Sequence, residues 1–283
     1  MLTRHRWACF RVVVCTAFVC SGRAAAAQGS LGTAQQFGVL GAVTVTNTNA
    51  TTINGSLGVS PGSSITGLGT ITLTGALHQT NGVALQAQAD ARTAYNTFGA
   101  LSPTQNLTGQ DLGGLLLTPG VYSFANSAQL TGNLTLNFLG LPNASFVFLI
   151  GSSLTTASAS SVSVINGNSS GGIFFRVGSS ATLGSSTVFQ GNILAERSIT
   201  LVSTAKILCG RAIALGAAVT LDNNVISTNC AGGGNYGSGN TDFGSMGYAG
   251  IPSTTSVVPE PSTMLLMSAG MVVIGLIARR KLA

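Results

Sequence analysis

Triplets in which two apolar residues flank a threonine or serine recur along this chain, and they constrain its fold more than any other feature. Successive side chains of a β-strand point to opposite faces, so each triplet buries two apolar side chains and exposes one hydroxyl group. Glycine and asparagine separate the triplets, as turns between short strands require. The triplets are Val43-Thr44-Val45, Ile71-Thr72-Leu73, Leu134-Thr135-Leu136, Val162-Ser163-Val164, Ala181-Thr182-Leu183, Ile199-Thr200-Leu201 and Val219-Thr220-Leu221.

The segments that carry these triplets also repeat at a nearly fixed spacing. Residues Phe148–Thr155 match Phe175–Thr182 at an offset of 27, and the triplet centred on Thr182 recurs at Thr200 and Thr220, offsets of 18 and 20. Offsets near 20 predict one coil of a β-solenoid (β-helix) per repeat, and the longer offset predicts a coil with a surface insertion. A β-sandwich would also contain short alternating strands, but it would not repeat one face pattern at a fixed period.

The surface of such a fold must be covered mainly by threonine, serine, asparagine and glycine. Only 6% of the 283 residues are charged, against about a quarter in a typical soluble protein. Across residues 28–258 five basic residues balance five acidic ones, so the formal net charge of +6 comes from the two ends of the chain. Nucleic-acid binding would need a basic patch, and we therefore predict no nucleic-acid partner.

The N-terminus has the pattern of a secretory signal. Arg4, Arg6 and Arg11 form a basic start, an apolar run over residues 12–20 follows, and Ala25-Ala26-Ala27 provides small residues for cleavage. We predict a signal peptide over residues 1–27. The alternative is a buried first helix.

The C-terminus carries a second sorting signal. Pro259-Glu260-Pro261 precedes an apolar stretch, Met264–Ala278, which ends in Arg279-Arg280-Lys281. Over residues 258–283 this order resembles the PEP-CTERM sorting signal of Gram-negative bacteria. The resemblance implies transient membrane association through the C-terminal helix, processing by an exosortase-type enzyme, and delivery to the outer cell surface or extracellular matrix. A plain C-terminal anchor is the alternative, although 15 residues are fewer than the ~20 of a usual membrane span.

Two further segments complete the domain organisation. One face of residues 83–98 is apolar at helical spacing, and Gly99 and Pro103 follow it, so we expect one long α-helix packed along the solenoid. Residues 231–257 are rich in glycine, serine and asparagine, which is typical of a linker. The solenoid domain should therefore span residues 28–230. The residues of the apolar helical face are Val83, Ala84, Ala87, Ala91, Ala94, Tyr95 and Phe98.

Two cysteines remain once the signal peptide is removed. Cys209 and Cys230 lie 21 residues apart, which is about one coil. An even number of cysteines in an exported chain predicts a disulfide, and residues at near-equivalent positions of successive coils lie at a suitable separation. The bridge would hold the last coil in place. A buried pair of thiols is the alternative.

Residues suited to catalysis are scarce. His78 is the one histidine of residues 28–258, so a metal site with two histidine ligands cannot form there. A solenoid glycosidase would need two facing carboxylates, for which Glu196 and Asp222 on neighbouring coils are the pair to examine. Surface or turn roles suit these residues better. We therefore predict no catalytic residue, no metal and no cofactor, and a protein that is not an enzyme.

The exposed hydroxyl groups are the remaining candidate site. One outward column should contain Thr155, Thr182, Thr200 and Thr220. A second column should contain the residue that lies four positions after each of the last three. Regularly spaced hydroxyl and methyl groups on a flat, uncharged sheet can hold an ordered layer of water. The alternative is that threonine is simply a good β-former at exposed positions. The members of the second column are Ser186, Thr204 and Asn224.

Four longer motifs resemble the microbial ice-binding protein family over residues 31 to about 228. The resemblance implies a discontinuous, roughly triangular β-solenoid with a long helix along one side, whose flat face binds ice. It also implies that the N-terminal coil does not stack in chain order, so that Thr44 and Thr46 join the face of the later coils. The motifs are Phe37-Gly38-Val39-Leu40, the segment 53–62, Leu117-Thr118-Pro119-Gly120-Val121-Tyr122 and Val219-Thr220-Leu221-Asp222-Asn223-Asn224.

These observations lead to one predicted function and one rival. The first is a secreted or surface-attached protein that adsorbs to ice or ordered water through a face bearing threonine, serine and asparagine. The second is a structural or adhesive matrix module on the same scaffold, with exopolysaccharide as its partner. Arg197 and Lys206 lie near the predicted columns in sequence, and the second column is not an unbroken threonine series.

Overall fold

The computed structural model describes residues 31–141, 144–167 and 172–229 of the chain. The predicted signal peptide, the linker, the C-terminal sorting signal and Cys230 lie outside the described residues. Within the three described ranges, no helix combines the length and the apolar character needed to cross a membrane.

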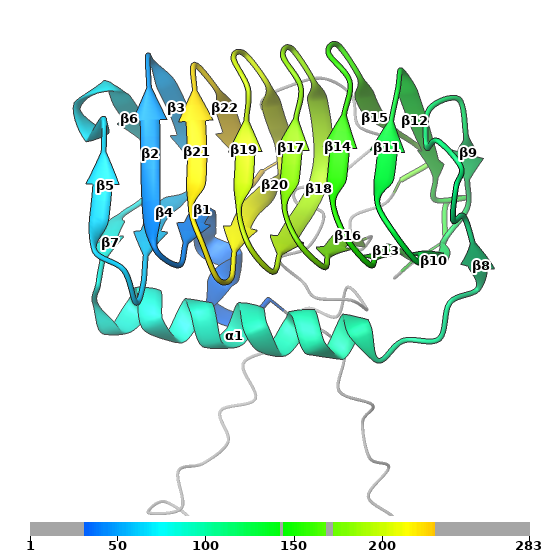
Figure 1. Cartoon of the computed structure of the whole chain (residues 1–283), viewed down its shortest axis with the longest axis horizontal. Helices are drawn as coiled ribbons and strands as arrows, with labels where there is room; N and C mark the ends of the chain where they lie inside the picture. The colour runs from blue at the N-terminus through cyan, green and yellow to red at the C-terminus, as the bar shows by residue number, and fades with distance from the viewer. Residues whose placement is uncertain (1–30, 142–143, 168–171, 230–283) are drawn as a thin grey trace, which may run out of the picture.

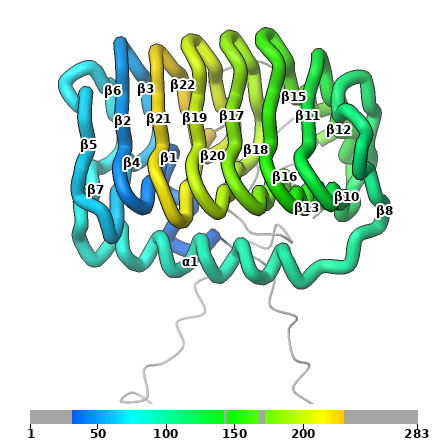
Figure 2. Tube along the Cα trace, in the orientation of Figure 1, coloured from blue at the N-terminus to red at the C-terminus, as the bar shows by residue number. Residues whose placement is uncertain are grey.

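Short parallel strands stacked side by side form the body of the molecule (Figure 1). Seven of them make one sheet, the seven-stranded sheet, whose strands run nearly parallel to one another (Figure 2). In spatial order its strands are β11 (Ala128–Leu130), β14 (Leu154–Thr156), β17 (Ala181–Leu183), β19 (Ile199–Leu201), β21 (Val219–Asp222), β2 (Thr44–Thr48) and β5 (Ser64–Thr66).

A larger sheet of fifteen strands supplies two further sides. The long strands β18 (Val188–Ala195) and β20 (Lys206–Ala214) run through both sides, and a bulge between Gln190 and Gly191 marks the bend. What we call the second side also contains β9 (Leu116–Leu117), β12 (Asn133–Asn137), β15 (Ser161–Ile165), β22 (Val225–Ser227), β3 (Thr51–Asn54) and β6 (Ile71–Leu73). The third side also contains β8 (Gln105–Asn106), β10 (Gly120–Phe124), β13 (Ser145–Ile150), β16 (Gly172–Val177), β1 (Phe37–Gly41), β4 (Ser56–Val59) and β7 (Leu77–Gln79).

The coils do not stack in chain order. The last coil pairs with the first, because β21 pairs with β2, β20 with β1, and β22 with β3. The second coil lies beyond the first, through the pairs β2–β5, β3–β6 and β4–β7. Strands from the two termini of the domain are therefore neighbours near one end of the stack (Figure 1).

Apolar side chains that point inward fill the space between the sheets. The offset of 27 between the two matching segments is confirmed, because Phe148 pairs with Phe175 and Thr155 with Thr182. The rings of Phe148 and Phe175 stack with their centroids 4.4 Å apart and their planes 6° apart. Tyr122 extends this stack on one side, 5.4 Å from Phe148, and Phe189 extends it on the other, 4.7 Å from Phe175. Aromatic rings on successive coils, of which Tyr122, Phe148 and Phe175 are equivalent in register, thus stabilise the stacking directly.

The predicted helix is present as α1 (Gly82–Gly99). Asn81 caps it by accepting a hydrogen bond from the Ala84 amide at 3.0 Å, which satisfies one of the free N–H groups of the first turn. Its buried face shares a cluster with Val147, Phe174 and Ile213 of the third side. The expectation that Val83 belongs to the buried face is wrong: Val83 is 40% exposed, whereas Gln88 is buried and donates to the Ala214 carbonyl at 3.1 Å.

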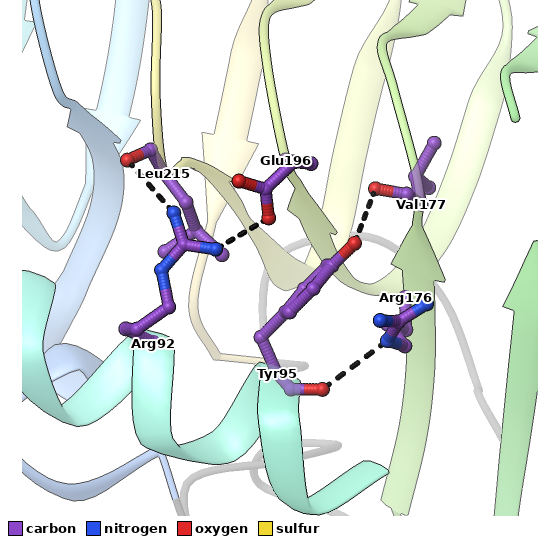
Figure 3. Close-up of polar contacts among 6 residues, drawn as sticks. All are labelled: Arg92, Tyr95, Arg176, Val177, Glu196 and Leu215. Carbon is purple, nitrogen blue, oxygen red and sulfur yellow. Dashed lines mark hydrogen bonds and ion pairs between the residues drawn. The ribbon is translucent and has the colours of Figure 1, made fainter. Parts of the chain in front are cut away.

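Polar contacts join α1 to the corner between the third side and the seven-stranded sheet (Figure 3). Arg92 forms an ion pair with Glu196 and donates to the Leu215 carbonyl at 3.3 Å. The Tyr95 hydroxyl donates to the Val177 carbonyl at 3.3 Å, and the Arg176 guanidinium lies 4.1 Å from the centre of the Tyr95 ring. Burial raises the pKa of Tyr95, so its hydroxyl remains a donor. The N-terminal 3-10 turn η1 (Gly32–Gln36) packs against the same helix.

Candidate functional site

The strand register brings the predicted threonines into a single line across the seven-stranded sheet. Thr155, Thr182, Thr200 and Thr220 pair in that order, as predicted, and Thr220 then pairs with Thr46. Two further members were not predicted, Gln129 at one end and Thr66 at the other. Neighbouring members are about 4.7–4.9 Å apart, the spacing of paired strands. We call this line the threonine column: Gln129, Thr155, Thr182, Thr200, Thr220, Thr46 and Thr66.

The hydroxyl groups of the threonine column face solvent. The apolar residues on either side of Thr182 and Thr200 are buried, so the threonine side chains point away from the core. Within the described part of the chain, the hydroxyls of its six threonines make no hydrogen bond to another protein group. These hydroxyl groups are therefore left to bond with water.

A second column runs beside the first, two residues earlier in each strand. Backbone hydrogen bonds stack its members: Leu154 donates to the Ser180 carbonyl at 3.1 Å and Ala181 to the Ser198 carbonyl at 2.9 Å. Some of its hydroxyls bond to each other, with Oγ–Oγ distances of 2.8 Å for Ser127–Ser153 and 2.9 Å for Ser180–Ser198. We call this line the serine column: Ser127, Ser153, Ser180, Ser198, Ala218, Thr44 and Ser64.

Thr44 belongs to the serine column, where it pairs with Ser64. The remaining members were not predicted, although the sequence carries a signal for them. A serine or threonine stands two residues before the central threonine in five of the seven strands, and in a strand that spacing returns to the same face.

The predicted second column is right in bringing Ser186 and Thr204 together and wrong in including Asn224. Ser186 and Thr204 do contact each other, with their hydroxyl oxygens 2.8 Å apart, but they lie at the corner beyond the seven-stranded sheet. Both have left-handed backbones, with φ of 59° and 64°. The third member of this corner column is Asn223, with φ of 53°, because the turn after β21 is shorter than the turn after β19.

Asn224 instead points into the molecule and is 1% exposed. Its Nδ2 donates to the carbonyls of Val202 at 3.0 Å and Ala205 at 2.9 Å, and its Oδ1 accepts from the Asp222 amide at 2.6 Å. Asn224 therefore satisfies backbone groups of two coils and has no part in an outward face.

Charged groups lie at the margins of the two columns. Asp222 is the one charged residue among the seven strands, and it sits at the last position of β21, where it accepts a hydrogen bond from Asn49 at 2.8 Å. Arg197 lies at the corner before β19, and Lys206 begins β20 on the second side. Both columns themselves are uncharged.

The other two sides do not carry such an array. On the second side, one aligned row contains Val188, Lys206 and Val225 together with polar residues, so its chemistry changes from coil to coil. The triplets centred on Thr135, Ser163 and Thr72 lie on this side. The third side is covered by α1 (Figure 1).

The acidic pair proposed as a possible catalytic site does not come together. Glu196 precedes β19 and pairs with Arg92, whereas Asp222 is the last residue of the adjacent β21, so the two carboxylates lie at opposite ends of neighbouring strands. Among the described residues, no group of three or more histidine, cysteine or acidic side chains is placed to hold a metal ion. Cys209 is fully buried in β20, and since Cys230 lies outside the described residues, their pairing stays a prediction.

Comparison with known proteins points to one family. The model of the Ice-binding-like family matches residues 39–227, and the PEP-CTERM protein-sorting motif matches residues 257–281. The chain is 49% identical over 249 residues to an ice-binding protein of Nostoc sp. (strain HG1). The aligned region covers 88% of this chain and 86% of the relative.

Solved structures agree with the sequence relatives. The structure resembles the ice-binding protein of the Antarctic ascomycete Antarctomyces psychrotrophicus, with a TM-score of 0.67 and 39% identity over 70% of this chain and 97% of that one. It also resembles an ice-binding protein from an Antarctic biological consortium, with a TM-score of 0.68 and 40% identity over 71% of this chain and 90% of that one. The chain belongs to the Ice-binding-like family and carries a PEP-CTERM motif at its C-terminus.

Proposed function

We propose that this protein is secreted or surface-attached and adsorbs to ice through the threonine and serine columns, which together we call the hydroxyl face. The observation that carries the proposal is the register of the seven-stranded sheet, which aligns two uncharged rows over seven strands, with a hydroxyl group on every member but Gln129 and Ala218. The relatives of the chain are ice-binding proteins.

The mechanism follows from the two groups that each threonine exposes. Its hydroxyl bonds to a water molecule, and its methyl group favours an ordered arrangement of the waters around it. Because stacked strands hold these groups at regular intervals of about 4.7–4.9 Å, the bound waters are positioned in advance of contact with ice. A preorganised surface loses little conformational entropy when it binds. Adsorption of this kind needs no catalytic residue, and we propose that the protein is not an enzyme.

The two ends of the chain support export. The PEP-CTERM motif is consistent with processing by an exosortase-type enzyme and delivery to the outer surface or extracellular matrix of a Gram-negative bacterium. We propose that residues 1–27 form a signal peptide and that residues 231–257 link the domain to the sorting signal.

We also propose that the three sides form the discontinuous, roughly triangular solenoid that the sequence suggests, with α1 packed along one side. The stacking of the first coil on the last, and the buried cluster shared by α1 and the third side, support it. We keep the disulfide between Cys209 and Cys230 as part of this proposal.

Replacing Thr200 with tyrosine tests the site, since Thr200 lies near the middle of the threonine column. The aromatic ring would stand above the sheet and hold ice away from neighbouring coils. We expect inhibition of ice recrystallisation to fall by at least about tenfold, which corresponds to about 1.4 kcal/mol of binding free energy. The circular dichroism spectrum should not change, because the side chain at position 200 points to solvent.

A wild-type protein that neither shapes ice nor inhibits its recrystallisation at high concentration would overturn the proposal. It would favour the rival function, a structural or adhesive matrix module that binds exopolysaccharide. Retention of the wild-type protein by such a polysaccharide, with no effect on ice, would be the positive result for that rival.

A further inference from the structure

The two ends of the stack of coils are built differently. At one end, residues 104–117 cross the coil formed by β10, β11 and β12 and close it. Leu107 and Leu112 from this segment are buried in the core, and their amides donate to the carbonyls of Ser123 at 2.8 Å and Gln129 at 2.9 Å. Asp111 accepts hydrogen bonds from the amides of Gly113 and Thr131 at 2.7 and 2.9 Å. This end therefore has both a plug of apolar side chains and polar partners for its backbone.

The opposite end has no such apolar plug among the described residues, although the side chains of Gln79 and Thr80 donate to the backbone carbonyls of Ser63 and Gly62. Its coil consists of β5, β6, β7 and the 3-10 turn η2 (Leu68–Thr70). Each of the three strands pairs on one side only, with β2, β3 and β4 respectively. The side chains that should seal the core are only partly buried: Leu68 is 38% exposed and Leu77 40% exposed. Ile65, Ile71 and Leu73 are likewise partly buried against the core.

Proteins usually protect exposed strand edges with charged side chains, prolines or bulges. No charged residue occurs between Arg23 and Asp90, so the end coil carries none. Solenoids normally need a polar cap at each end. An apolar, uncharged end with three unpaired strand edges is instead suited to burial against another surface.

We infer that this end coil is the interface with a second copy of the chain, joined end to end about a two-fold axis. The closed end, plugged by Leu107 and Leu112, offers no open core to match this one, so we expect the second copy to dock through its own open end and not head to tail. A two-fold axis perpendicular to the stack brings two identical ends together, makes their edge strands antiparallel, and closes the assembly at a dimer. Two uncharged ends can meet without repulsion between like charges, and Leu68 and Leu77 of each copy would be removed from water.

The segment that follows Asn229 is the other possible occupant. The described residues end after β22, beside the first coil, where the Thr228 amide donates to the Asn54 carbonyl at 2.9 Å, and the first coil separates this point from the open end. However, residues 231–257 are rich in glycine, serine and asparagine, which makes them poor strand formers. The predicted bridge to Cys209 would also direct the chain toward β20, away from the open end. The second copy is therefore favoured.

Multi-angle light scattering over a range of protein concentrations tests the inference on the full-length chain purified in detergent, with the detergent mass subtracted. We expect the wild-type protein to have twice the mass of one chain. The double variant Leu68→Glu, Leu77→Glu should weaken the dimer at least about 100-fold, because it places like charges across the two-fold axis. Leu116→Glu is the matched control: Leu116 is 61% exposed at the closed end, and its substitution should leave the dimer intact.

Hydrogen exchange of the wild-type protein provides a second readout that does not depend on the fold of a variant. Amides of residues 64–79 should exchange slowly at concentrations where the dimer forms and faster on dilution. A wild-type protein that is monomeric at every concentration would overturn the inference and favour the chain's own C-terminal segment as the occupant. A dimer that persists in the double variant would overturn it too. Neither measurement involves ice, so this inference can fail while the proposed function stands.

Discussion

Neighbouring asparagines at the corner after β21 have opposite roles. Asn223 is exposed and adopts a left-handed backbone with φ of 53°, which asparagine tolerates better than most residues. Asn224 is buried and bonds to three backbone groups. The sequence pattern does not distinguish them, because the one-residue difference in turn length between coils becomes visible only in the register.

Replacing Asn224 with alanine should destabilise the protein without touching the hydroxyl face. Three backbone groups would each lose a hydrogen bond, although the Val202 carbonyl would still accept one from the Ala205 amide, and we expect the free energy of unfolding to fall by about 2 kcal/mol. Urea unfolding followed by circular dichroism measures this change. Asn223→Gly is the matched control and should alter stability by less than about 0.5 kcal/mol, because its side chain is exposed and glycine tolerates positive φ. Equal effects at the two positions would contradict the assigned roles.

At the scale of single residues, the threonine column was predictable and the serine column was missed. Thr182, Thr200 and Thr220 sit at the centre of apolar triplets, so their direction follows from strand alternation alone. Ser180 and Ser198 lie just outside the triplets, where nothing local shows that the strand geometry continues. A triplet alone also does not identify the face, since Thr135 and Thr182 have the same pattern but lie on different sides.

Among the secondary-structure elements, α1 was the easiest to predict, because its buried alanines repeat at helical spacing over about three turns. Val83 was misplaced because it lies at the edge of the apolar stripe, whereas Ala84 beside it in the first turn is fully buried. The contacts that dock the helix were not predictable. Arg92 and Glu196 are 104 residues apart, and no local pattern links them.

Asp90 on α1 should make stability depend on pH in the acid range. Burial alone would raise the pKa of Asp90, but hydrogen bonds from the amide and hydroxyl of Thr33, both at 2.7 Å, and from Gln86 at 2.8 Å outweigh it and lower the pKa below 3.8. A lowered pKa stabilises the folded state above the unfolded pKa, and this contribution disappears as the pH falls through the folded value.

We therefore expect Asp90→Asn to be less stable than the wild-type protein at pH 7, by about 1 kcal/mol for a partly exposed group of this kind. The difference should shrink toward zero as the pH falls through the lowered pKa of Asp90, because the wild-type carboxyl then becomes protonated too. Guanidinium unfolding at several pH values measures both proteins side by side. A difference that stays constant down to pH 2 would show that the carboxylate charge is not responsible.

At the scale of the whole molecule, the period of the repeats predicted coils but not their order. Offsets of 18 to 27 residues follow from the chain length of one coil, and this length can be read locally. Placing the first coil beside the last depends on which strand edges are left unpaired once all other coils have formed. Only the resemblance to the ice-binding family pointed to that arrangement, and the pairing of Thr46 with Thr220 is its consequence for the site.

The central claim is that ice contacts the hydroxyl face and no other side of the molecule. It can be tested by measuring how much of each of three variants, relative to the wild-type protein, is incorporated into slowly growing ice. Thr182→Tyr alters the hydroxyl face, Thr52→Tyr the second side, and Thr93→Tyr the exposed surface of α1 over the third side. The account predicts that Thr182→Tyr loses at least about 90% of incorporation, corresponding to a tenfold loss of affinity, while the other two match the wild-type protein. Normal incorporation of Thr182→Tyr, or loss confined to Thr52→Tyr or Thr93→Tyr, would contradict it.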